Sequence, residues 1–145
     1  MILELNGQVN ADLMKAAIVG VTMDEEVLNC RVMVREDMLW WMPLADVRPE
    51  DLFMHFSTPH PSRILHQALS IPLEYRSGPL IRLILIHSTD PSYGDILVVN
   101  AHHIAMDGRG LKEVTRQFLH VTPGYCRERA NQPDTFHFHN ETSPE

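Results

Sequence analysis

The 145-residue chain has little of several features that each point to a particular class of protein. Its two cysteines, Cys30 and Cys126, have no metal-binding or redox spacing, so we expect free thiols in a reducing compartment, with one disulfide between them as the alternative. Only 12 basic residues accompany 19 acidic ones, and this net charge of −7 argues against a nucleic-acid partner. No apolar run approaches the roughly 18 to 20 residues of a membrane span.

The first residues also lack a targeting signal. MILELNGQVNADL has no basic segment and no cleavage-site pattern, so we expect a cytoplasmic protein. The composition, 44% apolar and 21% charged, is typical of a globular domain. The length corresponds to one domain with a substantial core.

Hydrophobic periodicity predicts an α+β domain, a mixed sheet with helices packed on one face. The two most aliphatic runs, LIRLILIH and ILVVNAHH, are expected to be adjacent central strands because both of their faces must be covered. The expected order is a strand near residues 2–6, a helix over 11–22, a hairpin over 27–44 that turns at Glu36 and Asp37, a short strand near 52–57, a helix from 61, the two central strands, and a helix over about 108–120.

The hairpin carries two consecutive tryptophans, Trp40 and Trp41. Neighbouring side chains on a strand point to opposite faces, so one tryptophan is expected in the core and the other more exposed. Their neighbours Met38 and Met42 fit ordinary core filling. An aromatic clamp for an acyl or pantetheine chain is the alternative for the tryptophans, but packing within the hairpin and core is the preferred interpretation.

The chain divides at about residue 121 into a folded lobe, residues 1–121, and a C-terminal tail, residues 122–145. The tail loses periodicity and gathers Pro, Asn, Asp and Glu, which predicts an extended or disordered segment. Two of its side chains, His137 and His139, could chelate a metal weakly if extended, although accidental surface histidines explain them better.

The stretch NAHHIAMDGRG, residues 100–110, carries the strongest chemical signal. Because the strand before it ends in two histidines, His102 and His103 are expected on opposite faces and cannot share a role. Asp107 is placed to return beneath the strand end and fix the loop. Gly108 offers a permissive backbone at the mouth of a helix, where a substrate can approach closely.

These residues resemble the HHxxxDG motif of the condensation-domain and chloramphenicol-acetyltransferase-like acyltransferases. The similarity extends to SGPLIRLILI before the motif, to GRGLKEVTRQFL after it, and to the hairpin VLNCRVMVREDMLWWMPL, and it covers about residues 1–120. It implies the N-terminal lobe of such an enzyme and transfer of an acyl group from a thioester to an amine, hydroxyl or thiol. The implied donor is acyl-CoA or a phosphopantetheine-linked acyl thioester on a carrier protein, with no tightly bound cofactor.

The resemblance also implies a role for each site residue. His103 is the general base, since a neutral imidazole can take the proton of the attacking acceptor. Asp107 is structural and holds the loop and an arginine, either Arg31 or Arg82. His102 faces the body of the domain, and Gly108 completes the catalytic loop.

Two features differ from the family. Members usually have Ser two residues after the motif glycine, where this chain has Gly110. Members also place the site in a tunnel between two lobes, and 145 residues provide one. The chain is therefore expected to be an acyltransferase that needs a homo-oligomer or a separate second lobe. The alternative is a non-catalytic binding or assembly domain, or a truncated remnant.

Two plainer interpretations of the motif are an exposed turn without a role and a metal site. Zinc needs three or four converging ligands, whereas adjacent histidines on a strand point apart, so we expect no metal. Arg109 and Lys112 could attract a phosphate of coenzyme A at the helix start, but a solvated helix face explains them equally well.

Overall fold

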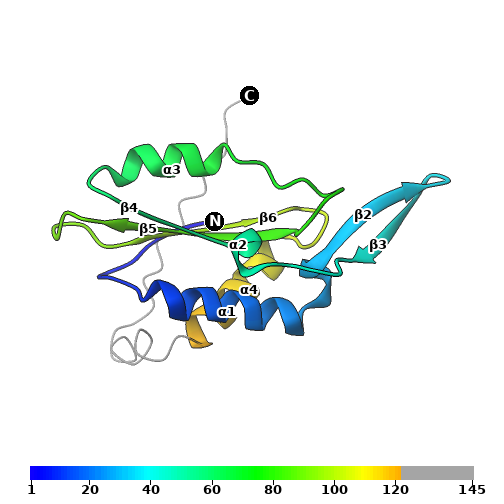
Figure 1. The fold of residues 1–145 in the computed structure, drawn as a ribbon, viewed down its shortest axis with the longest axis horizontal. Coiled ribbons are helices and arrows are strands. Elements are labelled where there is room, and N and C mark those ends of the chain that lie inside the picture. The colour runs from blue at the N-terminus through cyan, green and yellow to red at the C-terminus, as the bar shows by residue number, and fades with distance from the viewer. Residues whose placement is uncertain (122–145) are drawn as a thin grey trace.

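The computed structural model describes residues 1–121, which form one mixed sheet with helices on both faces and a projecting hairpin (Figure 1). The predicted tail and Cys126 lie outside the described residues. The predicted strands and helices occur in the predicted order, but the structure adds two short helices that were not predicted, η1 and α2. Residues 27–29, which were expected in the hairpin, belong to η1. The elements are β1 Ile2–Glu4, α1 Ala11–Asp24, the 3-10 helix η1 Glu26–Asn29, β2 Cys30–Arg35, β3 Met38–Pro43, α2 Pro49–Leu52, β4 Phe53–Thr58, α3 Pro61–Leu69, β5 Ile81–Ser88, β6 Ile96–Ala101 and α4 Gly108–Val121.

The central sheet has the strand order β1-β6-β5-β4. The two aliphatic runs become β5 and β6, which pair antiparallel at the centre of the sheet, as predicted. The weak signal near residues 52–57 is a true strand, β4, which pairs parallel with β5 and makes the sheet mixed.

One detail of the prediction is wrong, because the helices do not all lie on one face. Figure 1 shows α1 and α4 below the sheet and α3 above it. Side chains of β5 alternate between two clusters: Leu83 and Leu85 pack against α1 and α4, while Ile84 and Ile86 pack against α3. An amphipathic pattern identifies the buried side of a helix but not the face of the sheet that receives it.

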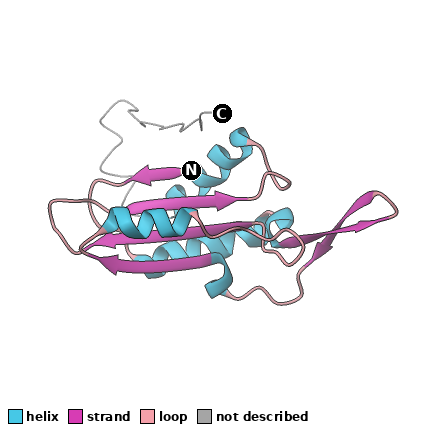
Figure 2. Ribbon diagram, turned by 90° about the horizontal axis from the view of Figure 1, so that it is seen from above, coloured by secondary structure: helices cyan, strands magenta, loops and turns pink. Residues whose placement is uncertain are grey.

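The hairpin of β2 and β3 forms a separate two-stranded sheet beyond the end of the main sheet (Figure 2). Its predicted turn is present, with Glu36 and Asp37 at φ 51° and 60°, the left-handed values of a type I′ turn. The expected burial of one tryptophan is wrong, since Trp40 and Trp41 are 51% and 42% exposed. Both remain in solvent because the strand that carries them projects away from the core.

Candidate functional site

The motif residues occupy a short loop between the centre of the sheet and α4. Strand β6 ends at Ala101, and α4 begins at Gly108. The loop is tied to the sheet where the backbone N–H of His102 donates to the carbonyl of Leu80 over 2.9 Å. A second bond, from the N–H of Ala105 to the carbonyl of His102 at 2.9 Å, closes a turn over the two histidines. The turn therefore fixes the backbone positions from which the two histidine side chains project.

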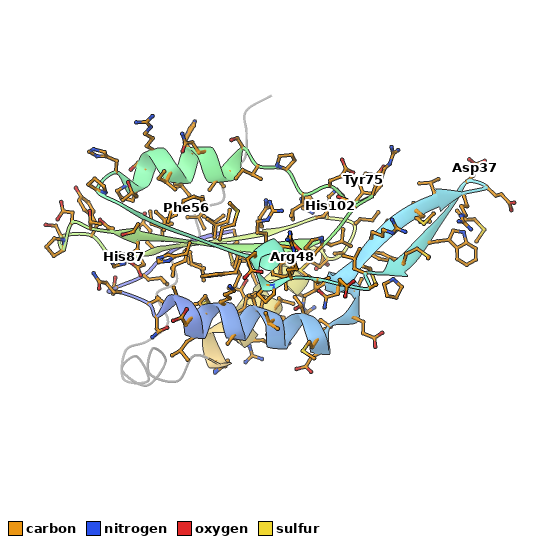
Figure 3. All side chains as sticks on the ribbon, viewed as in Figure 1. Asp37, Arg48, Phe56, Tyr75, His87 and His102 are labelled. Atoms are coloured by element: carbon orange, nitrogen blue, oxygen red, sulfur yellow. The ribbon has the colours of Figure 1, made fainter. Side chains whose placement is uncertain are left out.

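The two histidines have different surroundings. His102 is half-buried, and its ring lies 5.4 Å from the ring of Tyr75, at an angle of 53° (Figure 3). Its Nδ1 accepts the backbone N–H of Ile104 at 3.2 Å, so the neutral ring carries its proton on Nε2. His103 is exposed, and within residues 1–121 its ring has no hydrogen-bond partner. An exposed imidazole without a partner can meet a substrate.

Asp107 acts locally, as the cap of α4. Its Oδ1 accepts the N–H of Gly110 at 2.8 Å, and its carbonyl accepts the N–H of Leu111 at 3.0 Å. These bonds satisfy two of the donors that every helix leaves free at its N-terminus. The carboxylate therefore fixes the direction of the helix that follows the loop, which agrees with a structural placement.

Neither candidate arginine reaches that carboxylate in the described part of the chain. Arg82, on β5, donates from Nε to the carbonyl of Asp51 at 3.4 Å. Arg31 is exposed on the hairpin. The structure thus brings His102, His103, Asp107 and Gly108 together in one loop and leaves both arginines outside it.

Gly108 was expected to use the backbone freedom that only glycine has. The structure does not require that freedom, because the φ of Gly108 lies outside the left-handed region. Apart from its chain neighbours and the backbone of its own helix, no described atom comes within 4 Å of the position of a Cβ there, so the start of α4 is open to approach. Gly110 differs, since a Cβ at that position would come 3.1 Å from the Cβ of Met106. A side chain at 110 would therefore press on Met106.

A hollow of about 190 Å³ lies beside the loop, between η1 and α4. Met106 and Ala105 form its apolar wall, together with Val27 and Leu28. Glu113 stands at the hollow, and the hydrogen bond from Arg116 lowers the pKa of its carboxyl. The hollow is therefore apolar along the loop and anionic at one edge, which suits an uncharged chain better than a phosphate.

Sequence reasoning missed Tyr75, which contacts His102 through its ring and accepts the N–H of Val32 at 2.7 Å through its carbonyl. It lies between α3 and β5 in a segment without regular structure, so no periodicity marks it. The turn before Gly78, whose N–H donates to the carbonyl of Glu74 at 2.8 Å, brings it to the histidine.

Among residues 1–121, no three side chains of His, Cys, Asp or Glu are placed to share a metal ion. The tail pair His137 and His139 lies outside the described residues. None of the helices in that same range is long and apolar enough to span a membrane.

No protein-family model matches the chain, and no curated protein matches it significantly. Solved structures do resemble it. The epimerization domain from the third module of tyrocidine synthetase B has a TM-score of 0.71 at 18% identity, over 88% of this chain and 30% of that one. The SgcC5 protein from Streptomyces globisporus has a TM-score of 0.70 at 20% identity, over 92% and 30% of the two chains.

A third similar structure is the starter condensation domain of rhizomide synthetase RzmA, with a TM-score of 0.64 at 19% identity, over 87% of this chain and 31% of that one. This chain spans about 30% of the length of each of these proteins. That share is consistent with the N-terminal lobe that the sequence resemblance implied. The chain therefore has a fold found in part of condensation and epimerization domains.

Proposed function

We propose that this chain is one lobe of a condensation-type acyltransferase, with His103 as the general base. The observation that carries the proposal is the exposed, unpartnered ring of His103 at the end of a central strand of a condensation-domain fold. The loop that bears it also borders the apolar hollow, through Ala105 and Met106. The same loop therefore presents an exposed base and, two to three residues further on, an apolar surface, although His103 itself does not line the hollow.

The proposed reaction moves one proton and exchanges one bond. The acceptor, an amine, hydroxyl or thiol, attacks the thioester carbonyl carbon while Nε2 or Nδ1 of His103 takes its proton. The tetrahedral intermediate collapses, the C–S bond breaks, and the leaving thiolate recovers that proton from the imidazolium. Such a base contributes about 10² to 10⁴ in rate, so a facing surface must supply orientation and stabilise the oxyanion.

The proposed donor is an acyl thioester on coenzyme A or on a carrier protein. A variant of the rhizomide starter condensation domain has been solved with C8-CoA, which is consistent with a CoA-linked acyl donor for this fold. The apolar lining, which includes Val27 and Met106, suits an acyl chain, and Glu25 and Glu113 disfavour an anionic group such as a phosphate. We further propose a cytoplasmic location, where such thioesters are made.

The test measures acyl transfer from octanoyl-CoA to a panel of amines by mass spectrometry, with the complete chain at high concentration. We expect product that falls at least about 10²-fold in His103→Ala. His60→Ala is the matched control, since His60 is also exposed but lies before α3. Equal product from His103→Ala and the unsubstituted protein would show that His103 is not the base.

A non-catalytic binding or assembly domain is the second candidate. The chain spans about 30% of its structural neighbours, and one of them is an epimerization domain, so the fold alone does not fix the reaction. This candidate predicts no product with any thioester, and no effect of His103→Ala on the association of the protein with its partner.

A further inference from the structure

The hairpin exposes many large apolar side chains to solvent. Its large side chains are exposed on both faces: Val34, Met38, Leu39, Trp40, Trp41 and Met42, each by 38% or more. Large exposed apolar side chains gathered on one projecting element indicate an interaction surface.

The outer edge of β3 is also free to form backbone hydrogen bonds. The N–H of Leu44 donates to the carbonyl of Asn29 across the hairpin, whereas the N–H of Val32 points away from β3, to the carbonyl of Tyr75. Because bonded and non-bonded pairs alternate along an antiparallel ladder, Leu39 and Trp41 direct their N–H and C=O groups outward. Within residues 1–121 these groups have no hydrogen-bond partner.

Within residues 1–121, this edge carries none of the usual protection against pairing with another strand. Natural edge strands are protected by charged side chains, bulges or covering loops. From Met38 to Met42 the strand reads MLWWM, without a charge, and its proline, Pro43, comes only at the end. An unprotected edge of this kind is expected to be covered in the functional protein.

We propose that β3 pairs antiparallel with β3 of a second copy of this chain, around a two-fold axis between the two Trp40 side chains. This inference does not depend on acyl transfer. Backbone bonds then join Leu39 to Trp41 of the second copy and Trp41 to Leu39 of the second copy, so each free group meets its complement. The paired hairpins form a four-stranded sheet.

The register explains why a second copy fits. A two-fold contact uses the same surface twice, so that surface must be complementary to itself. Centred on Trp40, the pairing places Met38 opposite Met42 of the second copy and brings no like charges together on the joined strands. The arginines Arg31 and Arg35 belong to β2, so they fall on the outer strands. Shifting the register by one residue would pair an outward backbone group with an inward one.

The first test measures the mass of the complete chain by light scattering across a concentration series. We expect a dimer, with a dissociation constant at least about tenfold higher in Trp40→Lys and in Leu39→Pro. The proline removes an outward N–H and spares the bonds between β2 and β3. Met23→Lys is the control, because Met23 is 72% exposed on α1, away from the hairpin.

The second test reads the register directly. Trp40→Cys should give a disulfide-linked dimer under mild oxidation, since the two positions face each other at the axis. Met38→Cys should not, because the two copies of Met38 lie at opposite ends of the paired strands. Circular dichroism checks that each variant is folded. A monomeric unsubstituted chain, a dimer unaffected by both edge variants, or equal cross-linking at 38 and 40 would each overturn the proposal.

Discussion

The imidazole Nδ1 of His87 lies 2.8 Å from Oδ1 of Asp95, whose side chain is completely buried. The second carboxylate oxygen of Asp95 accepts the backbone N–H of Val9 at 2.7 Å. This pair closes the β5–β6 connection and ties it to the segment that leads into α1. Figure 3 places His87 far along the sheet from His102, and the register agrees, so the pair is a structural anchor at the end opposite the motif.

Removing that anchor should destabilise the fold without touching the motif. Asp95→Ala leaves the N–H of Val9 and the ring of His87 without their acceptor, and we expect a loss of about 2 to 4 kcal/mol in the free energy of unfolding. Urea denaturation measures the change. The control Glu4→Ala removes an exposed carboxylate and should alter stability by less than about 0.5 kcal/mol. A similarly small change in Asp95→Ala would contradict the anchoring role.

Two glycines should respond in opposite directions to substitution by alanine. A Cβ on Gly94 would overlap the carbonyl oxygen of Leu5, and backbone atoms cannot yield cheaply, so Gly94→Ala should cost at least about 2 kcal/mol. Gly20 lies within α1 with no atom within 4 Å of its Cβ position. Gly20→Ala should therefore stabilise the protein by about 0.5 to 1 kcal/mol. Thermal unfolding of both variants measures whether each melting temperature rises or falls. Equal shifts in melting temperature would contradict this packing argument.

The first turn of α1 depends on one side chain. Oδ1 of Asn10 accepts the N–H groups of Asp12 and Leu13 at 3.0 and 3.1 Å. Asn10→Ala removes both bonds and should lower the free energy of unfolding by about 1 kcal/mol, whereas Asn10→Ser should retain most of it. Chemical denaturation compares the two variants, and equal losses would show that the cap contributes little.

Burial should make Cys30 slow to react and should couple stability to pH. Burial, with a smaller contribution from Glu26, raises the pKa of the Cys30 thiol. The native protein therefore holds the thiol proton more tightly than the unfolded chain does. This contribution to stability is complete below the unfolded pKa of about 8.5 and is lost as pH rises through the higher folded value.

The reactivity of the Cys30 thiol is measured in the variant Cys126→Ser, in which Cys30 is the remaining cysteine. Iodoacetamide should modify native Cys30 much more slowly than the same residue in urea, and the difference should narrow as the pH rises. Cys30→Ser provides the background rate. Equal rates in the native and unfolded protein would mean that the thiol is accessible.

Local patterns were sufficient to predict most of the elements, because strands and longer helices depend mainly on which side chains must be buried. The aliphatic runs of β5 and β6 have apolar residues on both faces, and both strands are found at the centre of the sheet. The turn at Glu36 and Asp37 was predicted from its position between the alternating run VLNCRVMVR and the apolar run MLWWMPL. These features depend on near neighbours in the chain.

Features that depend on distant segments could not be predicted in the same way. Trp40 lies in a continuously apolar strand, and only the direction of the whole hairpin leaves its side chain in solvent. Tyr75 reaches His102 through an irregular segment without a pattern. Asp107 illustrates a third case, since its carboxylate bonds to Gly110, three residues away, where the family resemblance implied an arginine.

Because the side chains of β5 alternate between the two clusters, this strand contributes to the hydrophobic core on each face of the sheet. If α3 detached, Ile84 and Ile86 would meet water, and the strand that supports Leu83 and Leu85 on the other face would lose its cover. The two layers should therefore unfold as one cooperative unit, with the amides of β5 exchanging hydrogen only through global opening. The hairpin lies outside this unit, so in a single chain its amides should exchange first.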